Sequence, residues 1–379
     1  MENLNIVREI MTMLISTDTT NPPGNELALV NKIVDFLALK PTEYKIINCG
    51  DNRADLVIDV IGKKVGKYTT FVGHLDTVTV SDHKCWKYPP FKAYCDGENI
   101  YGRGACDMKG GVTAMILLYK RLKSNPPEFS VRFVFTADEE KNGIGIAAAY
   151  KNGVFDDVDQ VIICEPTSLK IGVCEKGAVW LNFKIFGKSC HAAHPSEGVN
   201  AIENAFELLN GLKFEIENRA QPYKLLGKNS FQITEIKSGT QINIIPDCAC
   251  ASVDLRTIPQ QNNTNADILN FINQYVYDYK LHNSGVDIEY GILCNRESIS
   301  NNADSGNVQR IVDILRNNYI EPEYIGINFF TDGSLFIPQT KIPFVILGPG
   351  KQKECHTVNE KIEIKEIAKA VEIYFQIVK

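Results

Sequence analysis

The sequence predicts an α/β protein in which a mixed, helix-flanked sheet is interrupted by an inserted α+β domain. Two observations lead to this fold class. Four apolar stretches in the first half of the chain end in acidic or histidine residues and alternate with helical patterns. The order then changes to β-α-β-β-α-β, that of a ferredoxin-like sandwich, before the first pattern resumes. We therefore expect one domain from residues 1–175 and 296–379, and a second from residues 176–295.

Length and composition narrow the class of protein. A chain of 379 residues is too long for one ordinary core. A net charge of −6 without a Lys/Arg cluster argues against a nucleic-acid partner. No apolar run approaches the roughly 20 residues that span a membrane, and acidic residues near the start argue against a signal peptide. Eleven cysteines, an odd number without a Cys-x-x-Cys motif, favour a cytoplasmic protein.

The elements expected before residue 165 follow from apolar spacing and turn residues. They are helices over 3–16 and 25–38, strands over 54–61 and 68–72, a helix ending near residue 122, a strand over 131–136, a short helix after Gly143 and a strand over 160–164. The strands are rich in β-branched and aromatic residues, which suits burial inside a sheet. Chemistry in an α/β sheet sits at the carboxyl ends of strands, so residues that follow these strands are site candidates.

The remaining elements form the inserted domain and the return to the first one. The insert contains strands over 179–186, 230–237, 249–256 and 286–293, with helices over 199–212 and 266–279. After it we expect a helix over 306–318, a loop over 330–334, a strand over 343–347 and a closing helix over 365–378.

The polar residues at the strand ends make up a candidate metal site. They are His74, Asp76, Asp107, Glu139, Glu140, Glu165 and, far downstream, His356. Two imidazoles with several carboxylates suit a pair of divalent cations, with zinc first, and one carboxylate can bridge both ions. Because the side chains of adjacent residues diverge, one member of the Glu139–Glu140 pair can bind metal while the other carries protons.

Taken singly, each of these residues has an ordinary interpretation. A strand-end Asp or Glu is most often a helix cap or salt-bridge partner, and histidines such as His83 and His282 are usually surface residues. Together, the seven would leave negative charge uncompensated along one sheet edge unless a cation were bound. An acidic edge that binds calcium is a rival hypothesis, but calcium prefers oxygen ligands and the two site histidines argue against it.

Five motifs resemble those of the M20 metallopeptidase and deacylase family, in the family's order over nearly the whole chain. They are Gly73-His74-Leu75-Asp76, Gly102-Arg103-Gly104-Ala105-Cys106-Asp107-Met108-Lys109-Gly110, Asp138-Glu139-Glu140, Cys164-Glu165-Pro166-Thr167 and the late His356. The resemblance implies a zinc-exopeptidase-like catalytic domain, an inserted lid or dimerisation domain, and a homodimer. It also implies two divalent metal ions, zinc in the first place, with cobalt or manganese as alternatives.

The resemblance also implies a role for each candidate residue. The metal ligands would be Asp107 as the bridge, His74 and Glu165 on one ion, and Glu140 and His356 on the other. Asp76 would orient His74 without binding metal itself. Glu139 would be the general base that takes a proton from water and delivers it to the leaving amine.

Residues outside the metal site are implied for stabilising the oxyanion, which is the catalytic role of His191, and for binding the substrate. His191, in the inserted domain, matches a family histidine that reaches into the active site, often from the other subunit. Asn243 and Arg256 match lid residues that grip the substrate, and a planar guanidinium suits a substrate carboxylate. For these two residues an ordinary polar contact between strands is the alternative. Gly333 lies in a turn that resembles a family loop near the substrate, and His194 is expected to be structural.

The reaction implied is hydrolysis of the amide bond of an N-acyl amino acid. The leading substrate is N-succinyl-LL-diaminopimelate, in lysine biosynthesis, because the motif around Asp107 resembles the desuccinylases. Segments at 165–168 and 347–350 resemble the acetylornithine deacetylases at least as much, so an acetylornithine or other acyl-amino-acid deacylase is the alternative. Dipeptidases and carboxypeptidases share the same ligands. A non-catalytic metal- or ligand-binding member is the rival from another class, although no expected ligand is missing here.

A cysteine directly precedes four of the candidate residues. These are Cys106, Cys164, Cys190 and Cys355. The favoured interpretation is that each is a small buried hydrophobic residue. A redox-sensitive site is the alternative hypothesis.

Overall fold

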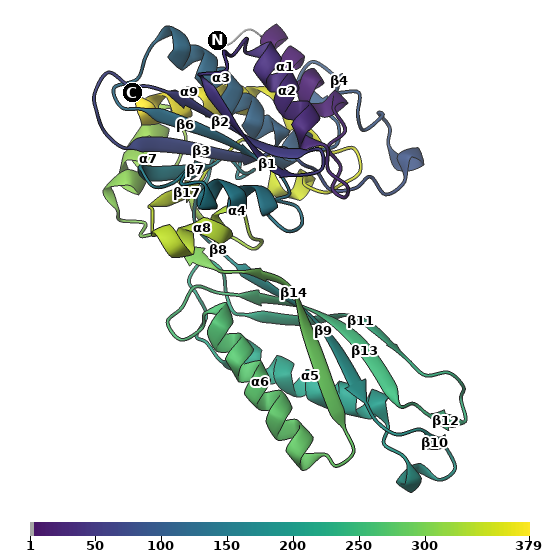
Figure 1. The fold of residues 1–379 in the computed structure, drawn as a ribbon. Helices are drawn as coiled ribbons and strands as arrows, with labels where there is room; N and C mark the ends of the chain where they lie inside the picture. Colours follow the sequence, from purple (N-terminus) through teal and green to yellow (C-terminus); the bar gives the residue numbers. More distant parts are fainter. Residues whose placement is uncertain (1–3) are drawn as a thin grey trace. The chain divides into compact units, whose positions relative to one another are not determined.

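The computed structural model describes residues 4–379, which form two compact units. The first unit contains the chain up to Val173, together with Asn301–Ile325 and Thr331–Lys379. The second contains Cys174–Ser300 and Gly326–Phe330. Both units combine helices with sheets, so the mixed α/β class is confirmed (Figure 1). No helix between residues 4 and 379 is long and apolar enough to cross a membrane.

The first unit alternates helices and strands along the chain. Its helices are α1 (Leu4–Ser16), α2 (Glu26–Phe36), α3 (Gly110–Ser124), α4 (Ile144–Lys151), α7 (Gly306–Asn317), α8 (Gly333–Thr340) and α9 (Ile364–Val378). Its main strands are β1 (Tyr44–Gly50), β2 (Arg53–Val60), β3 (Tyr68–His74), β6 (Val131–Thr136), β7 (Val158–Ile163) and β17 (Phe344–Ile346). A separate small sheet contains β4 (Tyr94–Cys95), β5 (Asn99–Tyr101) and β18 (Lys361–Glu363).

The main sheet begins with the order β1-β2-β6-β3-β7-β17 and continues beyond β17, and β6, β3, β7 and β17 run parallel. Every residue of β6 is buried, as expected for a strand covered on both faces. On one face Phe71 of β3 packs against Tyr374 of α9, with ring centroids 5.0 Å apart. The continuous apolar runs that predicted these strands therefore reflect burial on both faces of the sheet.

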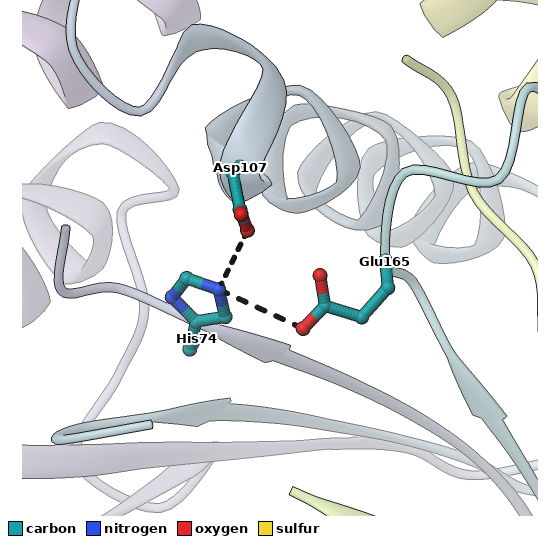
Figure 2. A group of neighbouring side chains, drawn as sticks. All are labelled: His74, Asp107 and Glu165. Atoms are coloured by element: carbon teal, nitrogen blue, oxygen red, sulfur yellow. Dashed lines mark hydrogen bonds and ion pairs between the residues drawn. The ribbon is translucent and has the colours of Figure 1, made fainter. Parts of the chain in front are cut away.

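The register of the parallel strands brings their carboxyl ends to one edge. His74 of β3 lies opposite Thr136, the last residue of β6. Val72 lies opposite Ile163 at the end of β7, which in turn lies opposite Ile346 at the end of β17. The ends of these strands and the segments that follow them therefore meet, and Figure 2 shows His74, at the end of β3, in contact with Asp107 and with Glu165, which follows β7.

Some elements of the first unit were not foreseen. The segment 330–334 was predicted to be a loop, but α8 begins within it, at Gly333. This helix starts with Gly and contains Pro338, so both of the residues that usually indicate turns lie inside a short helix. The edge strand β1 was also missed, because it alternates exposed and buried residues irregularly.

The second unit has the β-α-β-β-α-β order. It consists of β9 (Gly177–Phe186), α5 (Ala201–Asn218), β11 (Ser230–Ser238), β13 (Cys248–Thr257), α6 (Asn265–His282) and β14 (Asp287–Arg296). The sheet order is β11-β13-β9-β14, and every neighbouring pair is antiparallel. Strand β8 (Ile171–Glu175) carries the chain from the first unit into the second, where its last two residues pair with β15 (Ile299–Ser300).

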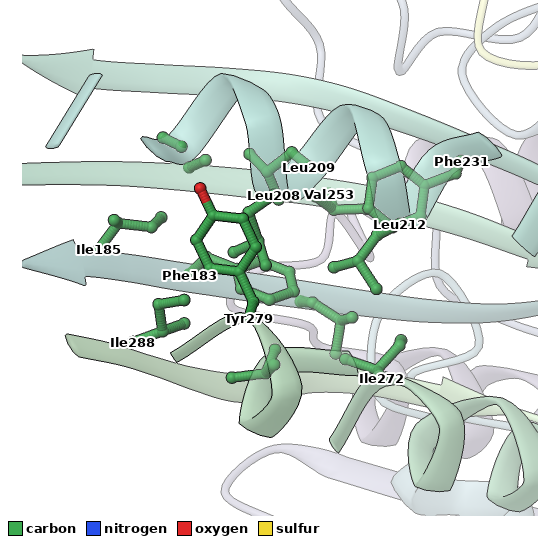
Figure 3. Close-up of a cluster of buried hydrophobic side chains, with 14 of the residues drawn as sticks. Phe183, Ile185, Leu208, Leu209, Leu212, Phe231, Val253, Ile272, Tyr279 and Ile288 are labelled. Carbon is green, nitrogen blue, oxygen red and sulfur yellow. The ribbon is translucent and has the colours of Figure 1, made fainter. Parts of the chain in front are cut away.

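The core of the second unit lies between its sheet and its two helices (Figure 3). Alternate residues of β9 and β13, such as Phe183 and Val253, point towards Leu208 of α5 and Ile272 of α6. This period of two is the pattern of an antiparallel sheet covered on one face. The intervening residues, Arg256 among them, therefore lie on the face that α5 and α6 do not cover.

Candidate metal centre

A first cluster of possible metal ligands joins His74, Asp107 and Glu165 (Figure 2). The His74 Nε2 atom lies 3.1 Å from Asp107 Oδ1 and 3.6 Å from Glu165 Oε1. All three residues are buried. They come from the end of β3, from the turn before α3 and from the segment after β7. One imidazole and two carboxylates at these separations are a ligand set suited to a divalent cation.

A second cluster adjoins the first and shares Asp107 with it. His356 Nε2 lies 3.3 Å from Asp107 Oδ2 and 3.1 Å from Glu140 Oε2. Each carboxylate oxygen of Asp107 therefore faces a different histidine. His356 has φ of 59° and a half-exposed side chain, so this cluster is the more open of the two. The arrangement fits two ions with Asp107 as a bridge, which is the ligand set expected from the sequence.

The charges of this centre favour bound cations. Burial raises the pKa of Glu165 well above its ordinary value and also raises that of Glu140, and the charge of Asp107 adds to both shifts. Hydrogen bonds to Asp107 and Glu140 raise the pKa of His356 to about 10. Burial lowers the pKa of His74, but its bonds to Asp107 and Asp76 outweigh this and raise it. These shifts reflect several buried carboxylates held close together, whose negative charge bound metal ions would offset.

Asp76 supports the centre from behind. Its Oδ1 and Oδ2 accept hydrogen bonds from the backbone N–H groups of Glu139 and Glu140, at 3.1 and 3.2 Å. His74 Nδ1 lies 3.0 Å from the backbone oxygen of Asp76 and 3.6 Å from its carboxylate. The His74 ring thus contacts Asp76 mainly through the backbone oxygen, and the Asp76 carboxylate fixes the turn that carries both glutamates, which was not expected.

A buried polar network extends this support and was missed in the sequence. Asn21 donates to Asp76 Oδ2 and to Asp138 Oδ1, both at 2.8 Å. Arg53 donates to the same Asp138 oxygen at 2.8 Å and forms a two-pronged ion pair with Glu26. Asn21 lies in the 16–24 segment, whose turn residues indicated a loop without indicating any partner.

A second missed residue, Glu360, holds the Asp107 turn. Its carboxylate accepts hydrogen bonds from the N–H groups of Gly104, Cys106 and Asp107, at 2.8 to 3.0 Å. It also accepts a bond from Arg103 at 2.7 Å. Glu360 follows His356 by four residues, so it ties the segment of the second cluster to the bridging residue. Its place in the chain could have drawn attention to it, but no motif indicated its partners.

Glu139 lies beside both clusters. Its side chain is buried, and burial raises the pKa of its carboxyl group well above the ordinary value. The nearby charges of Glu165 and Asp332 add to this shift. A buried carboxyl group with a raised pKa beside possible metal ligands is a candidate general acid–base.

The segment that contains Gly333 reaches the same sheet edge. Thr136, the last residue of β6, donates a hydrogen bond to Asp332 Oδ2 at 2.6 Å. The N–H of Gly333 donates to Thr331 Oγ1 at 3.1 Å, at the start of α8. Gly333 is therefore next to a carboxylate whose charge acts on Glu139 and Glu165.

The other three candidates outside the metal site belong to the second unit. His191, in β10 (Cys190–His191), lies opposite Ile244 of β12 (Ile244–Ile245). The N–H of Ala192 donates to the Asn243 carbonyl at 2.9 Å, so the structure brings His191 and Asn243 together, and both are exposed. Arg256 instead binds Asp254 with both prongs, at 2.7 and 2.9 Å.

The remaining histidines show local contacts. His194 donates its backbone N–H to the carbonyl of His191 at 2.8 Å. His282 Nδ1 lies 2.7 Å from the carbonyl of Asp278 on an exposed face of α6. His83 is exposed and lies 6.3 Å from the ring of Phe91. None of these three belongs to the two clusters of the described residues.

Fold and site together define a metal-dependent hydrolase of amide bonds. Residues 70–379 match the model of peptidase family M20/M25/M40. The match covers most of the chain, so the protein belongs to this family.

Relatives and solved structures agree with this assignment. A probable succinyl-diaminopimelate desuccinylase of Staphylococcus aureus (strain MSSA476) is 26% identical over 400 residues, covering 97% of this chain and 95% of the relative. A tripeptidase from Staphylococcus aureus superposes with a TM-score of 0.80 at 21% identity, over 100% of this chain and 98% of that one. A dinuclear metal-binding M20 peptidase from Bacillus subtilis has a TM-score of 0.73 at 15% identity, over 99% and 98%. At these identities the two structures show the fold alone.

Proposed function

We propose that this enzyme uses two divalent cations, zinc in the first place, to cleave the amide bond of an N-acyl amino acid. One observation carries the proposal: the two carboxylate oxygens of Asp107 face His74 and His356 separately, at 3.1 and 3.3 Å. His74, Glu165 and Asp107 would hold one ion, and Glu140, His356 and Asp107 the other. Cobalt or manganese could take the place of zinc at such oxygen and nitrogen ligands.

The residues around the clusters have separate tasks. Bound cations would supply Lewis acidity and lower the pKa of a water molecule. Glu139 would accept the proton of that water and return it to the leaving amine. Asp76 keeps the Glu139 backbone and the His74 ring in place, at 3.1 and 3.0 Å. His191 would donate a hydrogen bond to the oxyanion, and Asn243 and Arg256 would hold the substrate.

For the substrate we propose N-succinyl-LL-diaminopimelate. The name of the Staphylococcus aureus relative and the motif around Asp107 support this choice. A succinyl group ends in a carboxylate, which would replace Asp254 on the guanidinium of Arg256. Acetylornithine and other acyl amino acids are the first alternatives. A short peptide is a second candidate, favoured by the structural likeness to a tripeptidase.

The second unit supports a homodimer. His191 and Asn243 lie beside the start of β13, where Gly187 donates to Asp247 at 2.8 Å, whereas Arg256 is near the end of that strand. Eight residues of extended chain separate the two positions by about 26 Å. Because His191 and Arg256 lie too far apart to contact one small substrate, we propose that His191 acts in the site of a partner copy. We keep the prediction of a cytoplasmic enzyme, supported by eleven free cysteines.

A hydrolysis panel tests the substrate and the metal together. The purified enzyme, stripped of metal and reloaded with zinc, cobalt or manganese, is assayed with succinyl-diaminopimelate, acetylornithine, other acyl amino acids, and di- and tripeptides. We expect the highest kcat/KM for the succinyl substrate. If a peptide has a higher kcat/KM than every acyl amino acid, the proposed substrate class changes from acyl amino acids to short peptides.

Two neighbouring variants test the roles of the glutamates. Glu139→Gln should lower kcat by roughly 10²- to 10⁴-fold while both ions stay bound. Glu140→Gln, the matched control one residue away, should lose one ion per chain. Near-normal hydrolysis by Glu139→Gln would show that another group moves the proton.

Mixed dimers test the composite site. His191→Ala and Glu139→Gln would each be nearly inactive alone, but a mixture that exchanges subunits should regain activity at one site per dimer. A mixture as inactive as its components would contradict the exchange of His191 between subunits.

A further inference from the structure

Two cysteines lie close together next to residues of the second cluster. The Sγ atoms of Cys106 and Cys355 lie 4.0 Å apart, although 249 residues separate them in the chain. Each directly precedes a residue of that cluster, Asp107 or His356. Both thiols also face the carbonyl of Lys351, at 3.4 and 3.9 Å. The contact therefore joins the two segments that deliver ligands to one metal position.

The other two cysteines that precede candidate residues are in different surroundings. Cys164 Sγ lies 3.7 Å from the carbonyl of Ile162, and Cys190 Sγ lies 3.4 Å from the carbonyl of His194. Cys248 and Cys250 stand two apart on the single strand β13, so a bond between them would join no separate segments. Among the four cysteines that directly precede candidate residues, the redox hypothesis therefore applies to the pair Cys106 and Cys355.

We propose that Cys106 and Cys355 form a reversible disulfide when a peroxide oxidises the protein, and that this bond releases the cation of the second cluster. The second half rests on the proposed function, because it requires a bound ion. One thiol sulfur attacks the peroxide, breaks its O–O bond and becomes a sulfenic acid, with loss of one water or alcohol. The other thiol attacks that sulfur, forms the S–S bond and releases a second water. The two sulfurs lose two electrons in total, and the peroxide oxygens gain them.

The consequence for the metal follows from the geometry. A disulfide is about 2.05 Å long, so the two sulfurs must approach by about 2 Å. Cys106 is buried and its N–H is bound by Glu360 at 2.8 Å, which holds its side of the pair. Cys355 lies in a partly exposed segment, and the next residue, His356, is half exposed. We therefore expect the Cys355 segment to move, and His356 to move with it, away from Asp107 and Glu140. Metal–ligand distances tolerate deviations of only about 0.2 Å, so such a movement would break the site.

The test uses the metal-loaded enzyme, freed of excess metal and incubated with hydrogen peroxide for hours, since buried thiols react slowly. Two quantities are measured: metal content per chain, and the peptide that links Cys106 to Cys355, found by mass spectrometry after free thiols are alkylated. We expect the linked peptide to form as one of the two ions is lost. Dithiothreitol and added metal should restore both the thiols and the ion.

Variants separate this pair from general oxidation. Cys355→Ser and Cys106→Ala, each made separately, should keep both ions under peroxide. Two variants are used because, if one fails to fold, the other still tests the proposal. The double variant Cys248→Ser/Cys250→Ser should respond like the natural protein. Single variants that lose the ion as readily as the natural protein would overturn the proposal.

The two readouts distinguish this inference from the proposed function. Absence of the linked peptide would overturn the disulfide whatever the enzyme hydrolyses. A linked peptide with both ions retained would overturn the coupling to metal. An enzyme that in its reduced state binds no ions would contradict the proposed function, whereas the linked peptide would still support the disulfide.

Discussion

At the scale of single residues, Asp76 lies beside the candidate metal centre but belongs to neither cluster of possible ligands. Its two oxygens accept bonds from Glu139, Glu140 and Asn21, and its backbone oxygen faces His74. Both oxygens of the carboxylate are thus occupied by bonds to residues outside the two clusters or to backbone N–H groups. We infer that it sets the direction of the His74 ring and of the glutamate turn.

Because His74 is proposed as a metal ligand and Asp76 as a supporting residue, we expect substitutions at the two positions to weaken metal binding to different extents. His74→Ala should bind one ion fewer per chain, because the first cluster loses its nitrogen ligand. Asp76→Asn should keep both ions but bind them roughly 10- to 100-fold more weakly. Metal analysis after dialysis against graded chelator measures both effects. An Asp76→Asn variant that lost an ion outright, as His74→Ala should, would make Asp76 a ligand.

Asp55 predicts a dependence of stability on pH. Burial raises its pKa to about 8, while the ordinary value is 3.8, and the charge of Asp332 adds to the shift. The folded state therefore holds a proton that the unfolded state has lost between about pH 4 and pH 8. Stability falls as the pH rises through that window. Asp55→Asn cannot titrate and keeps the carbonyl that accepts a bond from the N–H of Ala137, at 2.9 Å.

The difference in the free energy of unfolding between Asp55→Asn and the natural protein should therefore depend on pH. Near pH 5 the two should have similar free energies of unfolding, and near pH 8 the variant should be more stable by about 3 to 4 kcal/mol. Urea unfolding of both metal-free proteins at several pH values measures this. A difference that does not change between pH 5 and pH 8 would contradict the raised pKa.

At the scale of elements, two turns carry Asp107, Glu139 and Glu140, and a buried carboxylate holds each turn. Asp76 binds the N–H groups of the turn after β6, and Glu360 binds those of the turn before α3. Each carboxylate comes from a different segment from the turn that it holds. The ligands are therefore positioned by contacts distant in sequence, which explains why no local motif revealed Glu360 or Arg53.

Glu360→Gln should disturb the bridging residue through the backbone. The glutamine amide cannot accept every bond that the carboxylate accepts, and the buried partner Arg103 loses its counter-charge. We expect a loss of stability of about 3 to 5 kcal/mol and weaker binding of both ions. Chemical unfolding and metal titration measure the two effects.

The matched control lies three residues further on. Glu363 pairs with Lys351 and Lys365 near the surface, so Glu363→Gln should cost less than about 1 kcal/mol and leave metal binding unchanged. If the two substitutions had equal effects on stability and metal binding, the effects would come from loss of a negative charge and not from loss of support for the Asp107 turn.

At the scale of the whole molecule, the two units have separate cores, and all ligands of both clusters lie in the first. Ions that bind the folded state and not the unfolded chain stabilise what they bind. Removing metal should therefore lower the Tm of the first unit by roughly 5 to 10 °C and leave that of the second nearly unchanged. Calorimetry with and without chelator measures this. A single transition that moves as a whole would show that the two units unfold together.

Much of the architecture could be predicted because burial imposes simple patterns. Strands β3 and β6 are covered on both faces and show as apolar runs, while β9 and β13 are covered on one face and alternate. The polar residues after the parallel strands could then be collected into one site. The supporting residues could not, because Asn21 and Glu360 owe their roles to partners on other segments. The bond between Arg256 and Asp254 is likewise a matter of geometry that no motif encodes.

The shared position of Asp107 also has a consequence for how the enzyme is made. Synthesis delivers His74, Asp107 and Glu165 first, and His356 follows about 190 residues later, after the entire second unit. The ligands of the first ion are thus present on the nascent chain long before those of the second are complete. Glu360, which holds the Asp107 turn, is made after His356, so both clusters take their folded geometry only when the C-terminal segment is complete.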